Sequence, residues 1–169
     1  MTSGWAGMSA WIHRLSERLN RLTEALLVVI GVTMALVTGL QVFSRYVLNH
    51  SLFWSEEVGR ICLVWISFLG ASAAYKRRAH IGMDFLVVRL PQNIRRKLEA
   101  LVVLLSLIFF MVLMIYGTVF SSFITGQRTA ALGLPLTLAY LVIPLSGAIF
   151  SVHAVSNLCR LLESSRRDP

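Results

Sequence analysis

The sequence predicts an all-α integral membrane protein with four transmembrane helices, an N-terminal interfacial amphipathic helix and a short interfacial segment between spans 2 and 3. Three observations predict it. The chain is 56% hydrophobic and only 14% charged, with a mean hydropathy of +0.71, which is too apolar for an ordinary soluble domain. It contains four uncharged apolar runs, and its basic residues gather between these runs. We therefore expect a single membrane domain, residues 1–169, with spans at about 22–46, 56–76, 98–124 and 136–159.

The first 22 residues have helical periodicity. Their apolar positions recur at steps of three and four, at Met8, Trp11, Ile12, Leu15, Leu19 and Leu22. Arg14, Arg18 and Arg21 fall between them. This pattern predicts an amphipathic helix lying in the membrane interface with its basic side toward anionic headgroups. We do not expect a cleavable signal peptide, because the long apolar run begins only after Glu24.

Span 1 carries small residues at a spacing of four. Gly31, Ala35 and Gly39 place a stripe of small side chains on one side of this span, and Gly70 and Ala74 form a similar pair on span 2. Small residues at this spacing let a second helix approach closely. We therefore expect both sets to be helix-packing positions.

The start of span 2 carries a polar collar, made of Arg45, Trp54, Glu56, Glu57 and Arg60. We expect Ser55 to cap the helix, the two glutamates to lie in its first turn, and Arg60 to be within reach of both. The collar is either a solvated helix start or a docking point for another subunit. Catalysis is disfavoured, because no nucleophile or third partner accompanies the carboxylates.

The segment from Lys76 to Lys97 holds seven basic residues and one acid, Asp84. Ile81, Phe85 and Val88 can share the face of a short interfacial helix, and His80 lies four residues before Asp84. We expect these two residues to pair or cap the segment, since two ligands without a nearby cysteine do not make a zinc site.

Two prolines shape the end of the chain. The run from Ala100 to Gln127 is uncharged and is long enough for span 3. Pro135 is expected to start span 4. Pro144 lies inside that span, where it removes a backbone donor and crowds the carbonyl of Tyr140, so the sequence predicts a kink there.

The distribution of basic residues predicts the orientation. Thirteen of the sixteen lie on the side of the two termini and the middle loop, whereas Arg45, Arg60 and Arg128 lie on the other. This bias predicts a multi-pass membrane protein with both termini in the cytoplasm. Because the basic residues lie between apolar spans, the expected partner is the lipid bilayer and not nucleic acid.

The middle of each span contains no Asp, Glu, Lys or Arg, whereas ion and proton pathways usually contain such residues. We therefore predict no enzyme, no catalytic residue, no cofactor and no metal. Two alternatives remain open. The chain is a small haem-binding membrane subunit with His80 and His153 as axial ligands, or an autonomous four-helix transporter that uses carbonyls and hydroxyls.

Three stretches together resemble a known family. The collar FSRYVLNHSLFWSEEVGR, the span ICLVWISFLGASAAY and the following AHIGMDFL are similar to the small permease subunit (DctQ-like) of tripartite ATP-independent periplasmic (TRAP) transporters. The resemblance covers about residues 41–91 in motif and nearly the whole chain in layout. The positions that match the family's recurrent motif are Trp54, Glu56, Glu57, Arg60, His80 and Asp84.

The resemblance implies a function and two protein partners. In this family a large membrane subunit carries the substrate with sodium, a periplasmic substrate-binding protein delivers it, and the small subunit supports the large one. The substrate is usually a carboxylate-type organic acid. We therefore expect a non-catalytic scaffold subunit of a secondary active transporter.

Overall fold

The computed structural model describes residues 3–77 and 92–167. Its helices are α1 (Ser3–Tyr46), α2 (Phe53–Lys76), α4 (Gln92–Phe123), α5 (Leu136–Tyr140) and α6 (Val142–Arg167). Four helices in the described part are long and apolar enough to cross a membrane, which confirms the predicted fold class. The predicted interfacial segment between spans 2 and 3, with His80 and Asp84, lies outside the described residues.

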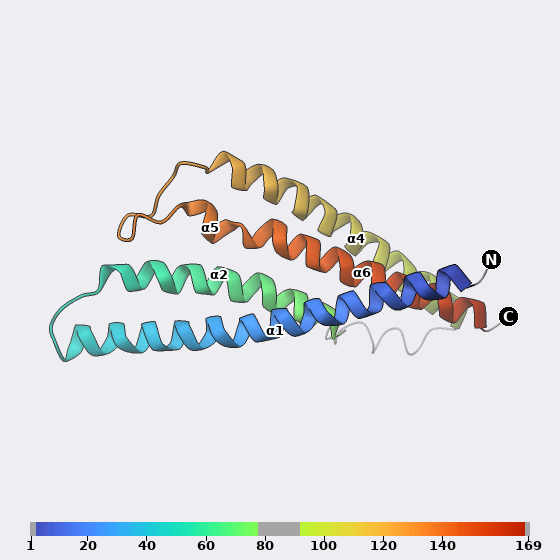
Figure 1. The fold of residues 1–169 in the computed structure, drawn as a ribbon, viewed down its shortest axis with the longest axis horizontal. Helices are drawn as coiled ribbons and strands as arrows, with labels where there is room; N and C mark the ends of the chain where they lie inside the picture. Colours follow the sequence, from blue (N-terminus) through green and yellow to red (C-terminus); the bar gives the residue numbers. More distant parts are fainter. Residues whose placement is uncertain (1–2, 78–91, 168–169) are drawn as a thin grey trace.

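The bundle consists of two antiparallel helix pairs. The helix α1 packs mainly on α2, and α4 packs mainly on α6, while α6 also contacts both helices of the first pair. Both chain termini lie at one end of the bundle, which we call the terminal end (Figure 1). The connections 47–52 and 124–135 lie at the opposite end, which we call the loop end.

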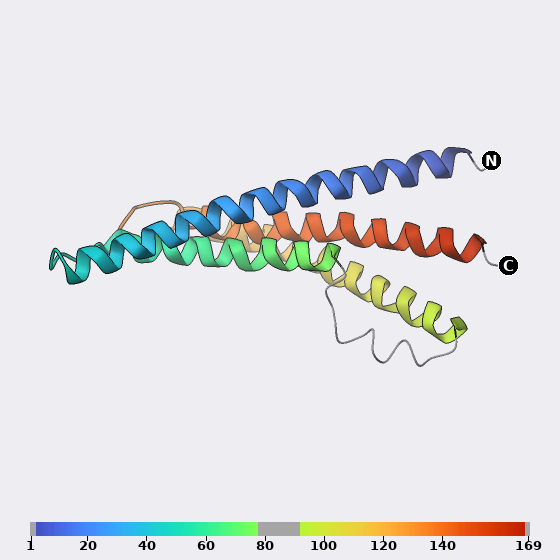
Figure 2. The ribbon, with the colours of Figure 1, turned by 90° about the horizontal axis from the view of Figure 1, so that it is seen from below.

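The helix α1 differs from the expectation for the N-terminal segment. It runs for 44 residues without a break, which corresponds to roughly 66 Å, against about 30 Å for a bilayer core. Residues 3–22 are helical as predicted, but they continue directly into span 1 (Figure 2). Their polar side faces the bundle, with Ser9 and Ser16 buried, and their apolar side is outward, with Trp11 61% exposed.

Two apolar clusters fill the bundle. Near the terminal end, Tyr75 meets Phe110 edge to face, with ring centroids 5.0 Å apart, and Phe110 stacks on Phe150 at 4.3 Å. Toward the middle, Leu69, Val142 and Ile149 form a second cluster. Because each cluster joins side chains of both helix pairs, apolar burial holds the pairs together along their length.

The helices α4 and α6 approach each other closely at two glycines. A Cβ atom added to Gly147 would lie 2.9 Å from the backbone nitrogen of Met114, and one added to Gly117 would lie 2.9 Å from the Ile143 side chain. Any larger residue there would force the helices apart. Gly117 and Gly147 form no regular stripe in the sequence, so their spacing does not predict this close contact.

Pro144 interrupts the last span, as predicted. The helix breaks at Leu141, between α5 and α6, one turn before the proline. Pro144 has no N–H group to donate to Tyr140, so the backbone opens at this turn. At the start of the span, Pro135 occupies the N-cap position of α5.

Candidate functional site

The loop end carries a hairpin-like connection pinned by a carboxylate. Within it, Thr129 N–H donates to the Leu134 carbonyl at 2.8 Å, and an isolated bridge pairs Arg128 with Pro135. The Glu57 carboxylate, from the first turns of α2, accepts the N–H groups of Ala131 at 2.7 Å and Leu132 at 2.9 Å. One side chain of the first helix pair therefore fixes the tip of the connection in the second pair, and we call this contact the loop junction.

One local prediction for the collar is wrong. Ser55 does not cap α2, because the helix begins at Phe53 after an extended Leu52, and the Ser55 hydroxyl donates instead to the Leu52 carbonyl at 2.6 Å. Arg60 is expected within reach of Glu56 and Glu57, and it forms no ion pair with either in the described part of the chain. The carboxylate of Glu57 is engaged by the loop, which competes with such a pair.

The remaining collar residues are accessible. Arg45, Glu56 and Arg60 are exposed and Trp54 is half-buried. Glu56 lies in the first turn of α2, as expected from the positive end of the helix dipole. The structure thus separates Glu57, which binds within the chain, from three charged residues that remain available at the surface.

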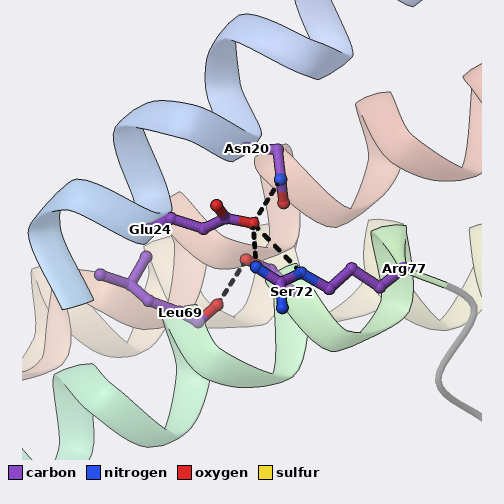
Figure 3. A network of polar contacts seen from close by, with 5 residues as sticks. All are labelled: Asn20, Glu24, Leu69, Ser72 and Arg77. Carbon is purple, nitrogen blue, oxygen red and sulfur yellow. Dashed lines mark hydrogen bonds and ion pairs between the residues drawn. The ribbon is translucent and has the colours of Figure 1, made fainter. Parts of the chain in front are cut away.

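Near the terminal end, a charged network joins α1 to Arg77, which directly follows α2 and is the last described residue before position 92. Glu24 Oε1 accepts hydrogen bonds from Arg77 Nη2 at 2.7 Å and from Asn20 Nδ2 at 2.7 Å (Figure 3). Arg77 Nε also donates to it at 3.2 Å. Because the Arg77 side chain is 66% exposed, this pair orients the helices more than it stabilises them.

A buried cluster joins three helices at the same end. Two reciprocal contacts link α1 to α6: His13 Nδ1 lies 2.7 Å from Ser156 Oγ, and Ser16 Oγ lies 2.8 Å from His153 Nδ1. From α2, Lys76 Nζ donates to Ser16 Oγ at 2.7 Å. We call these contacts the Ser/His junction.

One hydrogen-bond direction in this junction follows from the donors available. The Lys76 ammonium can only donate, so the Ser16 hydroxyl oxygen accepts from it, whereas the direction of the Ser16–His153 hydrogen bond depends on which ring nitrogen of His153 carries the proton. The other ring nitrogen of His153, Nε2, is buried without a partner among the described residues. The haem alternative stays a prediction, because His80 lies outside the described residues.

The spacing of uncharged polar residues and His13 along α1 is a sequence pattern that indicates this junction. Ser9, His13, Ser16, Asn20 and Thr23 recur at alternating steps of four and three, which is the spacing of a helix seam facing a partner. The prediction for residues 1–22 rests instead on the apolar positions and the arginines between them, and it places the basic side toward the headgroups.

The small-residue stripe of α1 is open. A Cβ atom added to Gly31 or Gly39 would meet nothing within 4 Å. The stripe forms part of an open groove of about 580 Å³, lined by Gly31, Met34, Ala35, Thr38, Gly39, Val42 and Ile66. On span 2, by contrast, a Cβ on Gly70 would lie 3.9 Å from Leu27, and Ala74 is half-buried.

No candidate metal centre occurs within the described residues. They contain no group of three His, Cys, Asp or Glu side chains that could hold a metal ion. Polar groups of this bundle form junctions at its two ends, and the exposed side chains along its spans are largely apolar. Such an arrangement can hold helices in place and offer surfaces to a partner.

Comparison with known proteins gives a consistent result. Residues 34–164 match the family model described as the DctQ component of tripartite ATP-independent periplasmic transporters. The chain is 32% identical over 163 residues to the ectoine TRAP transporter small permease protein TeaB of Halomonas elongata, covering 92% of this chain and 82% of the relative. It is 31% identical over 109 residues to the C4-dicarboxylate TRAP transporter small permease protein DctQ of Vibrio cholerae. This match covers 64% of this chain and 47% of the relative.

A third relative is much longer. The chain is 32% identical over 95 residues to the sialic acid TRAP transporter permease protein SiaT of Haemophilus influenzae, and this match covers 56% of this chain but only 14% of the relative. In that protein, a segment similar to this chain is therefore part of a far larger permease polypeptide.

Proposed function

Because the chain belongs to the DctQ family of TRAP transporter small permease components, we propose that it braces the large permease subunit of such a transporter. The transporter would take up a carboxylate-type organic acid together with sodium, from a periplasmic substrate-binding protein. In this proposal the chain is a multi-pass protein of the inner membrane with both termini in the cytoplasm. Thirteen of its sixteen basic residues support that orientation.

One observation carries the proposal: the bundle has a polar junction at each end, and the middle of its spans is uncharged. The Ser/His junction joins the helix pairs at the terminal end, and Glu57 joins them at the loop end. Between these ends, apolar side chains pack across the pairs. A bundle fixed in this way suits a rigid support, and it lacks the charged residues typical of an ion pathway.

Unequal burial of the helices supports a large membrane partner. The most apolar window of α1 has no buried residue and that of α4 is 6% buried, whereas the window of α6 is 44% buried. The open groove on α1 offers small side chains, which permit close approach of another helix. The longer relative SiaT supports the same partner, since its matching segment and the rest of the permease share one chain.

The exposed collar residues are proposed to dock this partner at the loop end. Arg45, Glu56 and Arg60 form no ion pair in the described part of the chain, so their charges are available to another subunit. His80 and Asp84 remain proposed contacts on the strength of the motif alone. The substrate class rests on the same family link, and two relatives named for a C4-dicarboxylate and for sialic acid support it.

Co-purification tests the proposal. The tagged chain is expressed with the large permease subunit of the same transporter and purified in mild detergent, and we expect the two chains to elute as one complex of fixed stoichiometry. The double variant Glu56→Ala with Arg60→Ala should reduce recovery of the large subunit while membrane insertion is unchanged. Elution of the wild-type chain free of the large subunit, although both are folded, would refute the bracing role.

A further inference from the structure

The part of α1 before Glu24, residues Ser3–Thr23, has two opposite faces, and we call it the α1 extension. One face is the polar seam that includes Ser16 and packs against α2 and α6. The other face lies two positions away along the sequence, which is about half a helical turn. It is exposed, and its members at steps of three and four are Gly7, Trp11, Arg14, Arg18 and Arg21.

The guanidinium groups on this outward face are available for binding. Arg18 and Arg21 have neither an ion pair nor a hydrogen bond to any described residue, and Arg14 bonds only to the carbonyl of Ala10, one turn earlier on the same helix. Glu17 is the one acidic residue in the described part of the α1 extension, and it is exposed. The outward face is therefore strongly basic.

The same face is also apolar. Met8 is 51% exposed, Trp11 61% and Leu22 62%. Water is a poor environment for these three side chains, and the acyl core is a poor environment for arginines. The headgroup region suits both kinds of side chain. An apolar side chain such as Leu22 can reach the acyl boundary while the guanidinium groups stay among the phosphates.

The position of the arginines along α1 agrees with that depth. The uncharged run of the span begins at Ala25. Arg21 and Arg18 lie roughly 6 and 10 Å before it along the helix axis. Arg21 therefore lies at the depth of the headgroups next to a span whose apolar core starts at Ala25, and Arg18 lies at their outer edge.

We propose that the inner part of this outward face, formed by Arg18, Arg21 and Leu22, binds anionic phospholipid headgroups selectively. The two arginines hold the phosphates through paired N–H donors, and the Leu22 side chain, roughly 5 Å before Ala25 along the helix axis, contacts the upper acyl chains. The seam on the opposite face keeps the α1 extension fixed to α6, so the binding surface is preorganised. This surface does not depend on the bracing role.

Native mass spectrometry of the full chain in detergent tests the proposal. The protein is titrated with an equimolar mixture of phosphatidylglycerol and phosphatidylcholine, and the ratio of the two bound lipids is measured. We expect the wild-type chain to prefer phosphatidylglycerol. The variant Arg18→Gln with Arg21→Gln should lower this preference by roughly fivefold for each arginine removed at low salt. The lost residues are exposed, so helicity should be unchanged.

The matched control is Arg45→Gln with Arg60→Gln, which removes two exposed, unpaired arginines at the loop end. This control should keep the wild-type preference. The proposal is overturned if both double variants lose the preference equally, or if neither loses it. It is also overturned if the wild-type chain shows no preference and Arg18 becomes protected from chemical labelling only when the large subunit is bound, since the face is then a protein interface.

Discussion

Ser16 Oγ lies 2.8 Å from Nδ1 of His153, 137 residues further along the chain, and both side chains are fully buried. Lys76 of α2 donates to the same serine oxygen, so one hydroxyl connects three helices. At the loop end, Glu57 of α2 binds the connection between α4 and α5. These two junctions make the two helix pairs one body, and the first two of the following tests concern them.

Replacing Ser16 with alanine should destabilise the bundle. The change leaves Lys76 Nζ and His153 Nδ1 without the hydroxyl that connects them, and a buried polar group left without a partner costs about 1–3 kcal/mol. Thermal unfolding followed by far-ultraviolet circular dichroism in detergent measures the change. We expect a clear fall in the unfolding temperature of Ser16→Ala.

The control is Ser67→Ala. Its hydroxyl is exposed and donates only to the Leu63 carbonyl one turn earlier in the same helix, so its removal should have little effect. Equal unfolding temperatures for the two variants would show that the Ser/His junction contributes nothing specific.

Replacing Glu57 with alanine should loosen the connection at the loop end. The carboxylate accepts the Ala131 and Leu132 amides, and without it both N–H groups are exposed to solvent exchange. Hydrogen exchange of residues 127–136, followed by mass spectrometry, should become faster in Glu57→Ala. Glu56→Ala removes a neighbouring exposed carboxylate that makes no hydrogen bond within the described part of the chain, and it should leave these rates unchanged. If the loop exchanges at the same rate in all three proteins, the loop junction is not a restraint.

Gly147 and Gly39 should respond in opposite ways to alanine. At Gly147 the added methyl group overlaps the Met114 backbone, and overpacking of this kind costs about 1–3 kcal/mol. At Gly39 the space is open, and alanine favours the helix over glycine by roughly 0.5–1 kcal/mol. Unfolding of the isolated chain should therefore be easier in Gly147→Ala but not in Gly39→Ala. Similar losses in both would contradict the close α4–α6 contact.

The groove on α1 should be needed for the complex and not for the isolated chain. Gly39→Leu fills the groove with a large side chain and should lower co-purification of the large permease subunit, while unfolding of the chain alone changes little. Val28→Leu, at a 66% exposed position of α1 outside the groove, is the control. Full recovery of the complex with Gly39→Leu would remove the groove from the interface.

Much of the fold could be predicted because lipid imposes strong rules on sequence. Uncharged runs predicted the four helices, and Pro144 predicted the break at Leu141, since a missing backbone donor acts locally. The collar and span motifs were enough to indicate the family. Each of these signals lies within one short stretch of the chain.

The junctions could not be predicted, because they depend on which helices become neighbours. The periodicity of residues 8–22 correctly gives two faces of a helix, but it does not say which face is covered. The partners of Ser16 come from α2 and α6, and those of Glu57 come from a connection more than 70 residues away. The residue type of Ser55 predicts a cap with the helix starting at Glu56, whereas the helix starts three residues earlier, at Phe53.

Solute uptake by reconstituted liposomes tests the central claim most directly. The chain alone, the large permease subunit alone and the two together are each reconstituted with an inward sodium gradient and the periplasmic binding protein loaded with its organic acid. We predict no uptake by the chain alone and uptake by the two subunits together that exceeds uptake by the large subunit alone. Sodium-driven accumulation by the chain alone would contradict the bracing role.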